Sequence, residues 1–225
     1  MNSNNLPSVF QVRTEEKPHI TKEQYQQVLT AIGTEPNPNR NLSQFKKDRN
    51  KLYVKMLWHT GGRNNDILDI KVSDINTTTK ILDLRVHKVW HVKRKLKNGE
   101  WKAGQDFKKV QIKLKDALIV DILNYLNQYN KHMPGDYLFT NSKGKRITKT
   151  QGYLVIKHYG NLINLPNLHP HMFRHGLAIY LMQQGIPTQI ISARLGHTNV
   201  FTTINTYQVI TPDVQESALR NVEFD

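Results

Sequence analysis

Residues 169–197 read HPHMFRHGLAIYLMQQGIPTQIISARLGH, and this stretch contains two apolar runs with helical spacing. Gly185 and Gly196 each follow one of these runs, at the position where a left-handed residue commonly ends a helix. Pro187 falls near the expected start of the second helix, where its fixed φ angle is tolerated. The stretch therefore predicts two consecutive helices, of which the first carries an HxxR pair and the second ends in LGH.

Helices are also expected before this stretch. Thr21 is a candidate N-cap, and the apolar residues behind it recur at helical spacing until Gly33 ends the pattern. Residues 42–59 show a mostly helical period that a turn at residues 60–62 ends, and another helix is expected over residues 117–129. These segments indicate that most of the chain is helical.

Between these helices the sequence changes to a β pattern. Apolar residues over 81–92 and 110–114 predict two strands joined by a long basic loop around residues 98–99, Asn-Gly. Residues 72–75 are expected to begin a strand, and residues 137–139 are a candidate short strand. The expected fold class is α+β, a mostly helical domain with a small antiparallel sheet.

The chain is strongly basic, because its 225 residues carry a formal net charge of +14. Such a charge attracts polyanions, so nucleic acid is the first candidate partner. The sequence has no cysteine, which excludes disulfides, thiolate metal sites and a cysteine nucleophile. No apolar run is long enough to cross a bilayer and the N-terminus lacks the features of a signal peptide, so we expect a cytoplasmic protein with no membrane partner.

Four separated segments hold the polar residues that carry chemistry. They are the turn TGGR at residues 60–63 with an aspartate three residues later, the lysines of the hairpin, the HMFR box at 171–174, and LGH at 195–197 followed by Tyr207. Each segment alone has an ordinary interpretation, as a capped helix start, a solvated surface or a helix connection. Their order and spacing along the chain are what point to one active site.

In this order and spacing the segments resemble the catalytic domain of the tyrosine recombinase (phage integrase) family. The resemblance spans about residue 20 to residue 215 and includes a nucleophilic tyrosine ten residues beyond the last histidine. Residues 1–18 are polar and show no sustained period, so we expect an N-terminal arm there and a catalytic domain over 19–225. Most members of the family have an N-terminal DNA-binding domain, and here we expect no separate one. The catalytic residues that the resemblance implies are Arg63, Lys88, His171, Arg174, His197 and Tyr207, with Asp66 orienting Arg63.

These residue types suit strand cleavage without a metal. Negative charge accumulates on a phosphodiester in its transition state, and Arg63 and Arg174 can donate paired hydrogen bonds to the non-bridging oxygens. His171 and His197 can add hydrogen bonds or accept the tyrosine proton, because imidazole titrates near working pH. Attack by Tyr207 would form a covalent link that stores the bond energy, so a second strand can reseal the DNA without ATP. We expect neither a metal nor another cofactor.

The hairpin is expected to contact DNA and to supply the general acid. Lys88 is favoured as that acid because it lies 25 residues past Arg63, close to the place of the family lysine. The other basic residues of the hairpin are expected to bind the DNA backbone, and they are Lys93, Arg94, Lys95, Lys97 and Lys102. The resemblance further implies double-stranded DNA as the substrate, a 3′-phosphotyrosine intermediate, a homodimer or homotetramer assembled on DNA, and a role in integration, excision or resolution for a mobile element or plasmid.

Other interpretations remain open from the residues alone. A type IB topoisomerase would share the chemistry, and a DNA-binding relative without activity would keep the residues without the reaction. His169, His171 and His175 form an HxHxxxH cluster that could bind zinc, although no cysteine or nearby carboxylate completes a ligand set. The remaining tyrosines, Tyr153 among them, fall mostly at helical apolar positions and are expected to be core or partly buried side chains.

Overall fold

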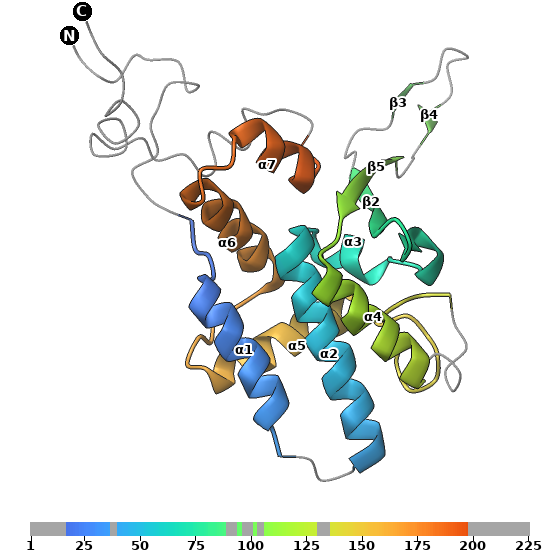
Figure 1. Ribbon diagram of the computed structural model, residues 1–225, viewed down its shortest axis with the longest axis vertical. Coiled ribbons are helices and arrows are strands. Elements are labelled where there is room, and N and C mark those ends of the chain that lie inside the picture. The colour runs from blue at the N-terminus through green and yellow to red at the C-terminus, as the bar shows by residue number, and fades with distance from the viewer. Residues whose placement is uncertain are drawn as a thin grey trace, which may run out of the picture.

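The structure is a computed structural model that describes residues 17–36, 40–88, 94–95, 101–102, 106–129 and 136–197. This part of the chain is mostly helical with a small antiparallel sheet, so the α+β prediction is confirmed (Figure 1). The elements are α1 (Lys22–Thr34), α2 (Arg40–Thr60), α3 (Asn64–Leu68), the 3₁₀ helix η3 (Val72–Asp74), β1 (Ile75–Asn76), β2 (Ile81–Lys88), β3 (Arg94–Lys95), β4 (Trp101–Lys102), β5 (Asp106–Lys113), α4 (Asp116–Tyr129), α5 (Lys149–Leu162), α6 (Pro170–Gln183) and α7 (Thr188–Leu195). No helix within these ranges combines the length and the apolar character that a membrane span needs.

Helix α2 is the centre of the helical body, since it packs against α1, α4 and α6. Its residues Tyr53, Met56 and Leu57 are fully buried. Tyr25 of α1 stacks on Trp58 of α2 with ring centroids 4.8 Å apart. Burial of this apolar face is the main stabilising contribution, because isolated helices of this length are marginal in water.

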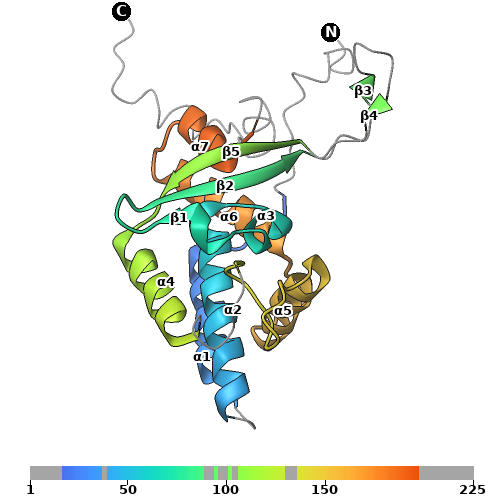
Figure 2. The same ribbon diagram turned by 90° about the vertical axis from the view of Figure 1, so that its right-hand side faces the viewer.

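The sheet lies across one end of this helical body. Its strand order is β1-β2-β5 and both pairings are antiparallel, with Leu84 opposite Val110. Along β2 the side chains alternate: Leu82, Leu84 and Val86 are buried, whereas the odd-numbered positions are partly exposed. Figure 2 shows the two long strands passing between α7 and α3, so one face of the sheet contacts each helix.

Several helix ends follow the sequence signals. Thr21 caps α1 in a capping box with Gln24, and Gly185 and Gly196 have φ angles of 73° and 68° after α6 and α7. Two predictions were wrong. Helix α1 continues through Gly33 to Thr34, because a glycine within a helix lowers its stability without ending it, and residues 72–74 form a 3₁₀ turn before β1 begins at Ile75. The candidate short strand over residues 137–139 is represented only by one isolated bridge, between Tyr137 and Lys71.

The segment that leads into α1 is fixed to α6. Ile20 is fully buried, and its backbone N–H donates to the carbonyl oxygen of Met172 at 3.3 Å. A Cβ atom placed on Gly176 would lie 2.0 Å from the carbonyl oxygen of Ile20, so only glycine permits this approach of the two backbones. Residues 17–20 therefore form part of the surface against which the HxxR helix packs.

Candidate active site

A glycine turn between α2 and α3 sets the place of Arg63. The Thr60 hydroxyl donates to the carbonyl oxygen of Met56 at 2.7 Å and accepts from the N–H of Gly62 at 3.0 Å. Gly61 has a φ of 66°, a left-handed conformation that a residue with a Cβ adopts only with strain. Arg63 follows as the N-cap residue of α3, so the turn delivers its side chain to the surface beside that helix.

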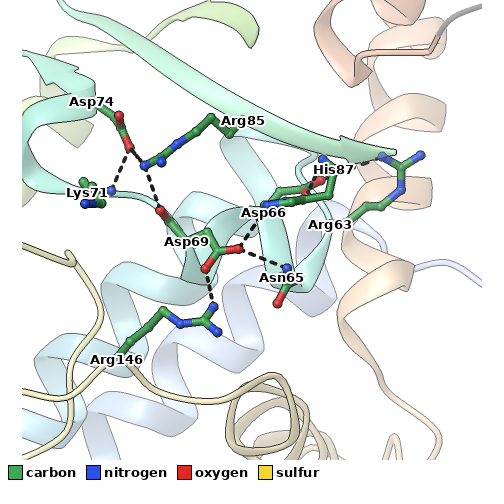
Figure 3. Close-up of polar contacts among 9 residues, drawn as sticks. All are labelled: Arg63, Asn65, Asp66, Asp69, Lys71, Asp74, Arg85, His87 and Arg146. Atoms are coloured by element: carbon green, nitrogen blue, oxygen red, sulfur yellow. Dashed lines mark hydrogen bonds and ion pairs between the residues drawn. The ribbon is translucent and has the colours of Figure 1, made fainter. Parts of the chain in front are cut away.

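Arg63 faces a buried carboxylate. Its side chain is 43% exposed, that of Asp66 is 2% exposed, and the Nη1–Oδ2 distance between them is 3.8 Å. The other carboxylate oxygen of Asp66 accepts from the backbone N–H of His87 at 3.1 Å and lies 3.0 Å from the Nδ1 of the same residue (Figure 3). The acidic residue three positions after the arginine is therefore beside it, at a distance that allows an ion pair but no direct hydrogen bond.

Arg174 is placed by α6 and held by the same glycine turn. Its residue is 2% exposed, and its Nη1 donates to the carbonyl oxygen of Gly61 at 2.8 Å. Pro170 begins the helix four residues earlier. A Cβ atom on Gly61 would lie 2.5 Å from Leu195 Cδ2 and 3.0 Å from Leu177 Cδ2. The turn, α6 and α7 thus meet at one point, which brings the TGGR, HxxR and LGH segments together.

His197 follows α7 in a turn fixed by Gly196. The backbone N–H of His197 donates to the carbonyl oxygen of Ser192 at 3.0 Å. A Cβ atom on Gly196 would lie 3.0 Å from Val110 Cγ2 and 3.1 Å from Val86 Cγ2, so this turn lies directly against β2 and β5. The contact places the last histidine beside the sheet that carries the hairpin lysines.

The histidines share an electropositive environment. Burial, followed by the charges of Arg174, Arg63 and His171 in that order, lowers the pKa of His197 to about 4. Burial likewise lowers the pKa of His171 to about 4, and the charge of Arg174 follows. Each of the two histidines is therefore within electrostatic reach of both arginines, in the region where the TGGR, HxxR and LGH segments meet. The expectation that these imidazoles titrate near working pH is not met in the free chain.

His169 and His175 complete the histidine cluster. Burial lowers the pKa of His175 to about 3, and its ring stands perpendicular to that of His171 with centroids 4.3 Å apart. His175 is buried, and burial also lowers the pKa of His169. Within the described ranges, no three or more His, Cys, Asp or Glu side chains are arranged to hold a metal ion.

A cleft of about 520 Å³ opens beside Arg63 and His171. Helix α5 contributes Lys149 and Tyr153 to its wall, and His87 lines it from β2. Tyr153 is 44% exposed, so of the core or partly buried places expected for the tyrosines it does not take the one in the core. Lys149 and Tyr153 are four residues apart, a spacing that places both on one face of a helix. This spacing could have indicated that α5 lines the cleft.

The hairpin residues of the predicted site are described only in part. Lys88 is the last residue of β2, opposite Asp106, and its position is two residues beyond Val86. Arg94, Lys95 and Lys102 lie in the paired strands β3 and β4. Lys93, Lys97 and the predicted nucleophile Tyr207 lie outside the described residues, as do residues 1–16 of the predicted arm.

Known proteins resemble the chain in both sequence and fold. Tyrosine recombinase XerA of Pyrococcus furiosus is 26% identical over 86% of this chain and 63% of its own length, and tyrosine recombinase XerC of Roseiflexus sp. is 25% identical over 82% and 53%. The chain thus spans about half to two thirds of the length of these relatives.

Solved structures give the same result for the fold. The crystal structure of XerA recombinase matches with a TM-score of 0.68 at 17% identity, covering 94% of this chain and 68% of that one. The Tn1549 transposon integrase in complex with a circular intermediate DNA matches with a TM-score of 0.69 at 17% identity, covering 93% and 67%. The model of the phage integrase family matches residues 18–212, which include all four motif segments. The chain therefore belongs to the phage integrase family.

Proposed function

We propose that the chain is a site-specific recombinase that cleaves and rejoins double-stranded DNA through a 3′-phosphotyrosine at Tyr207. The observation that carries this proposal is that the segments of Arg63, Arg174 and His197 meet at the Gly61 turn, although the first and last lie 134 residues apart in the sequence. Arg63 and His171 line the cleft beside this meeting point. The family membership and the names of the relatives support the same reaction. The phosphotyrosine step itself rests on the chemistry that follows.

In the proposed reaction the two arginines bind the scissile phosphate. Their guanidinium groups donate to the non-bridging oxygens and stabilise the charge that builds up as the Tyr207 oxygen attacks phosphorus. The new bond joins the tyrosine oxygen to the 3′-phosphate, and the bond to the 5′-oxygen breaks. The later attack of a 5′-hydroxyl reverses these changes and releases the tyrosine, so no ATP is consumed. Because the arginines supply the charge stabilisation, the step requires no metal ion.

His171 and His197 act as neutral hydrogen-bonding groups in this scheme. With pKa values of about 4 both imidazoles are uncharged at neutral pH, so each has a nitrogen that can accept a proton. A bound phosphodiester brings negative charge next to the rings and raises their pKa values. Substrate binding thereby moves the histidines toward the range in which they can accept the tyrosine proton.

We assign the proton that the leaving 5′-oxygen needs to Lys88. Alternate positions of a strand lie on one face of a sheet, so the position of Lys88 is on the same face as Val86, which contacts the turn before His197. The remaining basic residues of the hairpin bind the DNA backbone in this proposal. The working form is a homodimer or homotetramer on DNA, acting in the cytoplasm for a mobile element or plasmid.

Covalent trapping on DNA tests the proposed function. A library of nicked duplexes with randomised cores is incubated with the chain, and DNA that remains attached after denaturation is recovered and sequenced. We expect the wild-type chain to yield adducts and Tyr207→Phe to yield none while it still binds DNA. An adduct from Tyr207→Phe would move the nucleophile elsewhere, and DNA binding without any adduct would favour a non-catalytic relative.

Two further arms of this experiment refine the assignment. Cleavage in excess chelator should continue, and loss of cleavage that a divalent ion restores would revive the histidine-cluster interpretation. Relaxation of supercoiled DNA by a monomer, without exchange between sites, would favour a topoisomerase. For the general acid, Lys88→Ala should slow cleavage about a hundredfold to ten-thousandfold. A 5′-bridging sulfur should rescue it selectively, because the thiolate leaves without a proton.

A further inference from the structure

His87 lies between the carboxylate of Asp66, in helix α3, and that of Asp69, the residue that caps the end of this helix. Its Nδ1 is 3.0 Å from Oδ1 of Asp66, and its Nε2 is 3.4 Å from Oδ2 of Asp69 (Figure 3). The residue is the second-to-last of β2, and its side chain is 23% exposed at the edge of the cleft. One side chain of the sheet thus contacts both carboxylates, and one of them, Asp66, also faces Arg63.

These contacts determine how Asp66 presents its charge. One oxygen of this carboxylate is in contact with both the backbone N–H and the ring of His87. The other, Oδ2, has no hydrogen-bond donor among the described residues, and it is the oxygen that faces Arg63 at 3.8 Å. A buried carboxylate is costly unless it is paired, so the two contacts with His87 and the charge of Arg63 together stabilise it.

The far side of the His87 ring is also held. Asp69 forms an ion pair with Arg146 and accepts a hydrogen bond from the side-chain amide of Asn65 at 3.0 Å. Figure 3 shows the resulting chain of contacts from Arg146 through Asp69 and His87 to Asp66 and Arg63. The ring can therefore turn only by giving up a carboxylate contact, which restricts the orientation of Asp66 as well.

We propose that His87 is a positioning residue for Arg63: it holds Asp66 so that the second carboxylate oxygen faces the guanidinium and limits the directions in which Arg63 can extend. The inference rests on the proposed function, because it assigns Arg63 to the scissile phosphate. An exposed arginine must lose side-chain freedom when it binds phosphate, and a carboxylate already in place reduces that loss. His87 itself touches neither the substrate nor the reacting atoms in this proposal.

The first test compares three substitutions on a DNA duplex recovered from the covalent trapping. His87→Ala should slow cleavage of bound DNA about a hundredfold, the effect of a small misplacement of a group that stabilises the transition state, with a much smaller change in the dissociation constant. His87→Asn places its amide near Nδ1 and should restore most of the rate. His87→Gln places its amide near Nε2, toward Asp69, and should not. Wild-type cleavage by His87→Ala, or equal rescue by Asn and Gln, would overturn the proposal.

A matched control separates positioning from damage to the strand. Arg85 lies two residues earlier on the same face of β2, where its Nη2 contacts Asp74 Oδ2 at 2.5 Å and the carbonyl oxygen of Asp69 at 3.3 Å. Arg85→Gln should lower the free energy of unfolding while cleavage of bound DNA continues at the wild-type rate. If Arg85→Gln slows cleavage as much as His87→Ala does, the effect of His87 is structural and the proposal fails.

Two measurements identify the group through which His87 acts. In a double-mutant cycle, His87→Ala should cause no further loss of rate when Asp66 is already replaced by Asn, whereas additive losses would contradict a route through Asp66. A 5′-bridging sulfur should leave the defect of His87→Ala in place. Rescue by sulfur would instead show that His87 acts through its chain neighbour Lys88 and would overturn the assignment to Arg63.

A measurement that does not depend on DNA cleavage keeps this inference separate from the proposed function. The NMR signal of the Arg63 Nε–H group reports how firmly the side chain is held in the free protein. We expect the signal to broaden or to shift toward that of a mobile arginine in His87→Ala and to be retained in His87→Asn. An unchanged signal in His87→Ala overturns the inference, whereas absence of any adduct from the wild-type chain overturns the proposed function alone.

Discussion

The two arginines of the proposed site are held in opposite ways. Arg174 is 2% exposed and donates directly to a backbone carbonyl, that of Gly61, whereas Arg63 is 43% exposed and faces a carboxylate at 3.8 Å. The position of the buried arginine is set when the chain folds. The exposed arginine keeps rotational freedom that phosphate binding must remove. One half of the site is thus part of the protein core, and the other half adjusts to the substrate.

The largest expected difference between the two arginines is in chemical rescue. Arg63→Ala and Arg174→Ala should each lower the cleavage rate about a hundredfold to a thousandfold, since each removes a donor to the transition state. Free guanidinium, added well below denaturing concentrations, should restore part of the rate to Arg63→Ala because that place opens to the cleft. Free guanidinium should not restore the cleavage rate of Arg174→Ala. Equal concentrations of a bulky cation control for ionic strength, and rescue of both variants would remove the distinction.

The second difference is in stability. Arg174→Ala leaves a cavity and removes the donor to the buried carbonyl of Gly61, so the free energy of unfolding should fall by about 2 kcal/mol or more. Arg63→Ala removes a side chain that is 43% exposed and makes no direct hydrogen bond to Asp66, so it should cost less than Arg174→Ala does. Urea denaturation followed by circular dichroism measures both. Equal losses would show that Arg63 is as much a part of the core as Arg174.

The glycine turn between the arginines gives a smaller effect with a matched control. Gly61→Ala and Gly185→Ala both place a Cβ on a left-handed residue, with φ angles of 66° and 73°, at a cost of about 1–2 kcal/mol each. A Cβ on Gly61 also meets Leu195 at 2.5 Å, whereas nothing lies within 4 Å of a Cβ on Gly185. Gly61→Ala should therefore have the lower urea midpoint, and equal midpoints would show that the Leu195 contact yields freely.

The smallest expected effect is a change in the pKa values of His171 and His197, which NMR titration measures. The charge of Arg174 precedes that of Arg63 among the causes that lower the pKa values of His171 and His197 to about 4. Arg174→Gln should therefore raise both pKa values more than Arg63→Gln does. The reverse order would place the exposed arginine closer to the imidazoles than the buried one.

The same pKa values determine how stability depends on pH. The pKa of His171 is about 4 in the folded chain and near 6.5 when unfolded, so the unfolded state binds the proton first as the pH falls. Its contribution to stability is complete above pH 6.5 and is lost as the pH falls from 6.5 toward 4. His171→Gln should flatten this part of the profile, and an unchanged acid slope would contradict the depressed pKa.

The sequence predicted the motif residues of the site better than the residues that surround them. Arg63, His171, Arg174 and His197 could be identified because the order and spacing of their segments resemble the phage integrase family, and glycines, a proline and apolar periodicity indicated the ends of the elements that carry them. His87 and Tyr153 were missed. Strand alternation leaves an odd-numbered residue of β2 on the partly exposed face, but only the packing of α3 determines which carboxylates it meets.

The errors in the fold have a similar cause. Gly33 was expected to end α1, yet intrinsic propensity is a weak signal and the helix continues to Thr34. The apolar position of Tyr153 predicted burial, but α5 turns that face toward the cleft instead of the core. Local signals therefore located the elements, while the faces that they bury depended on contacts between residues far apart in sequence.

The close approach of Ile20 to Gly176 gives the segment before α1 a mechanical role. The hydrogen bond from Ile20 to Met172 and the missing Cβ at Gly176 join this segment to α6 without an intervening side chain. A force that pulls or twists the chain ahead of Lys17 therefore reaches the helix of His171 and Arg174 within one residue contact. Tension applied at that point would act first on the helix that carries His171 and Arg174, and it would reach Arg63 only through the Gly61 turn.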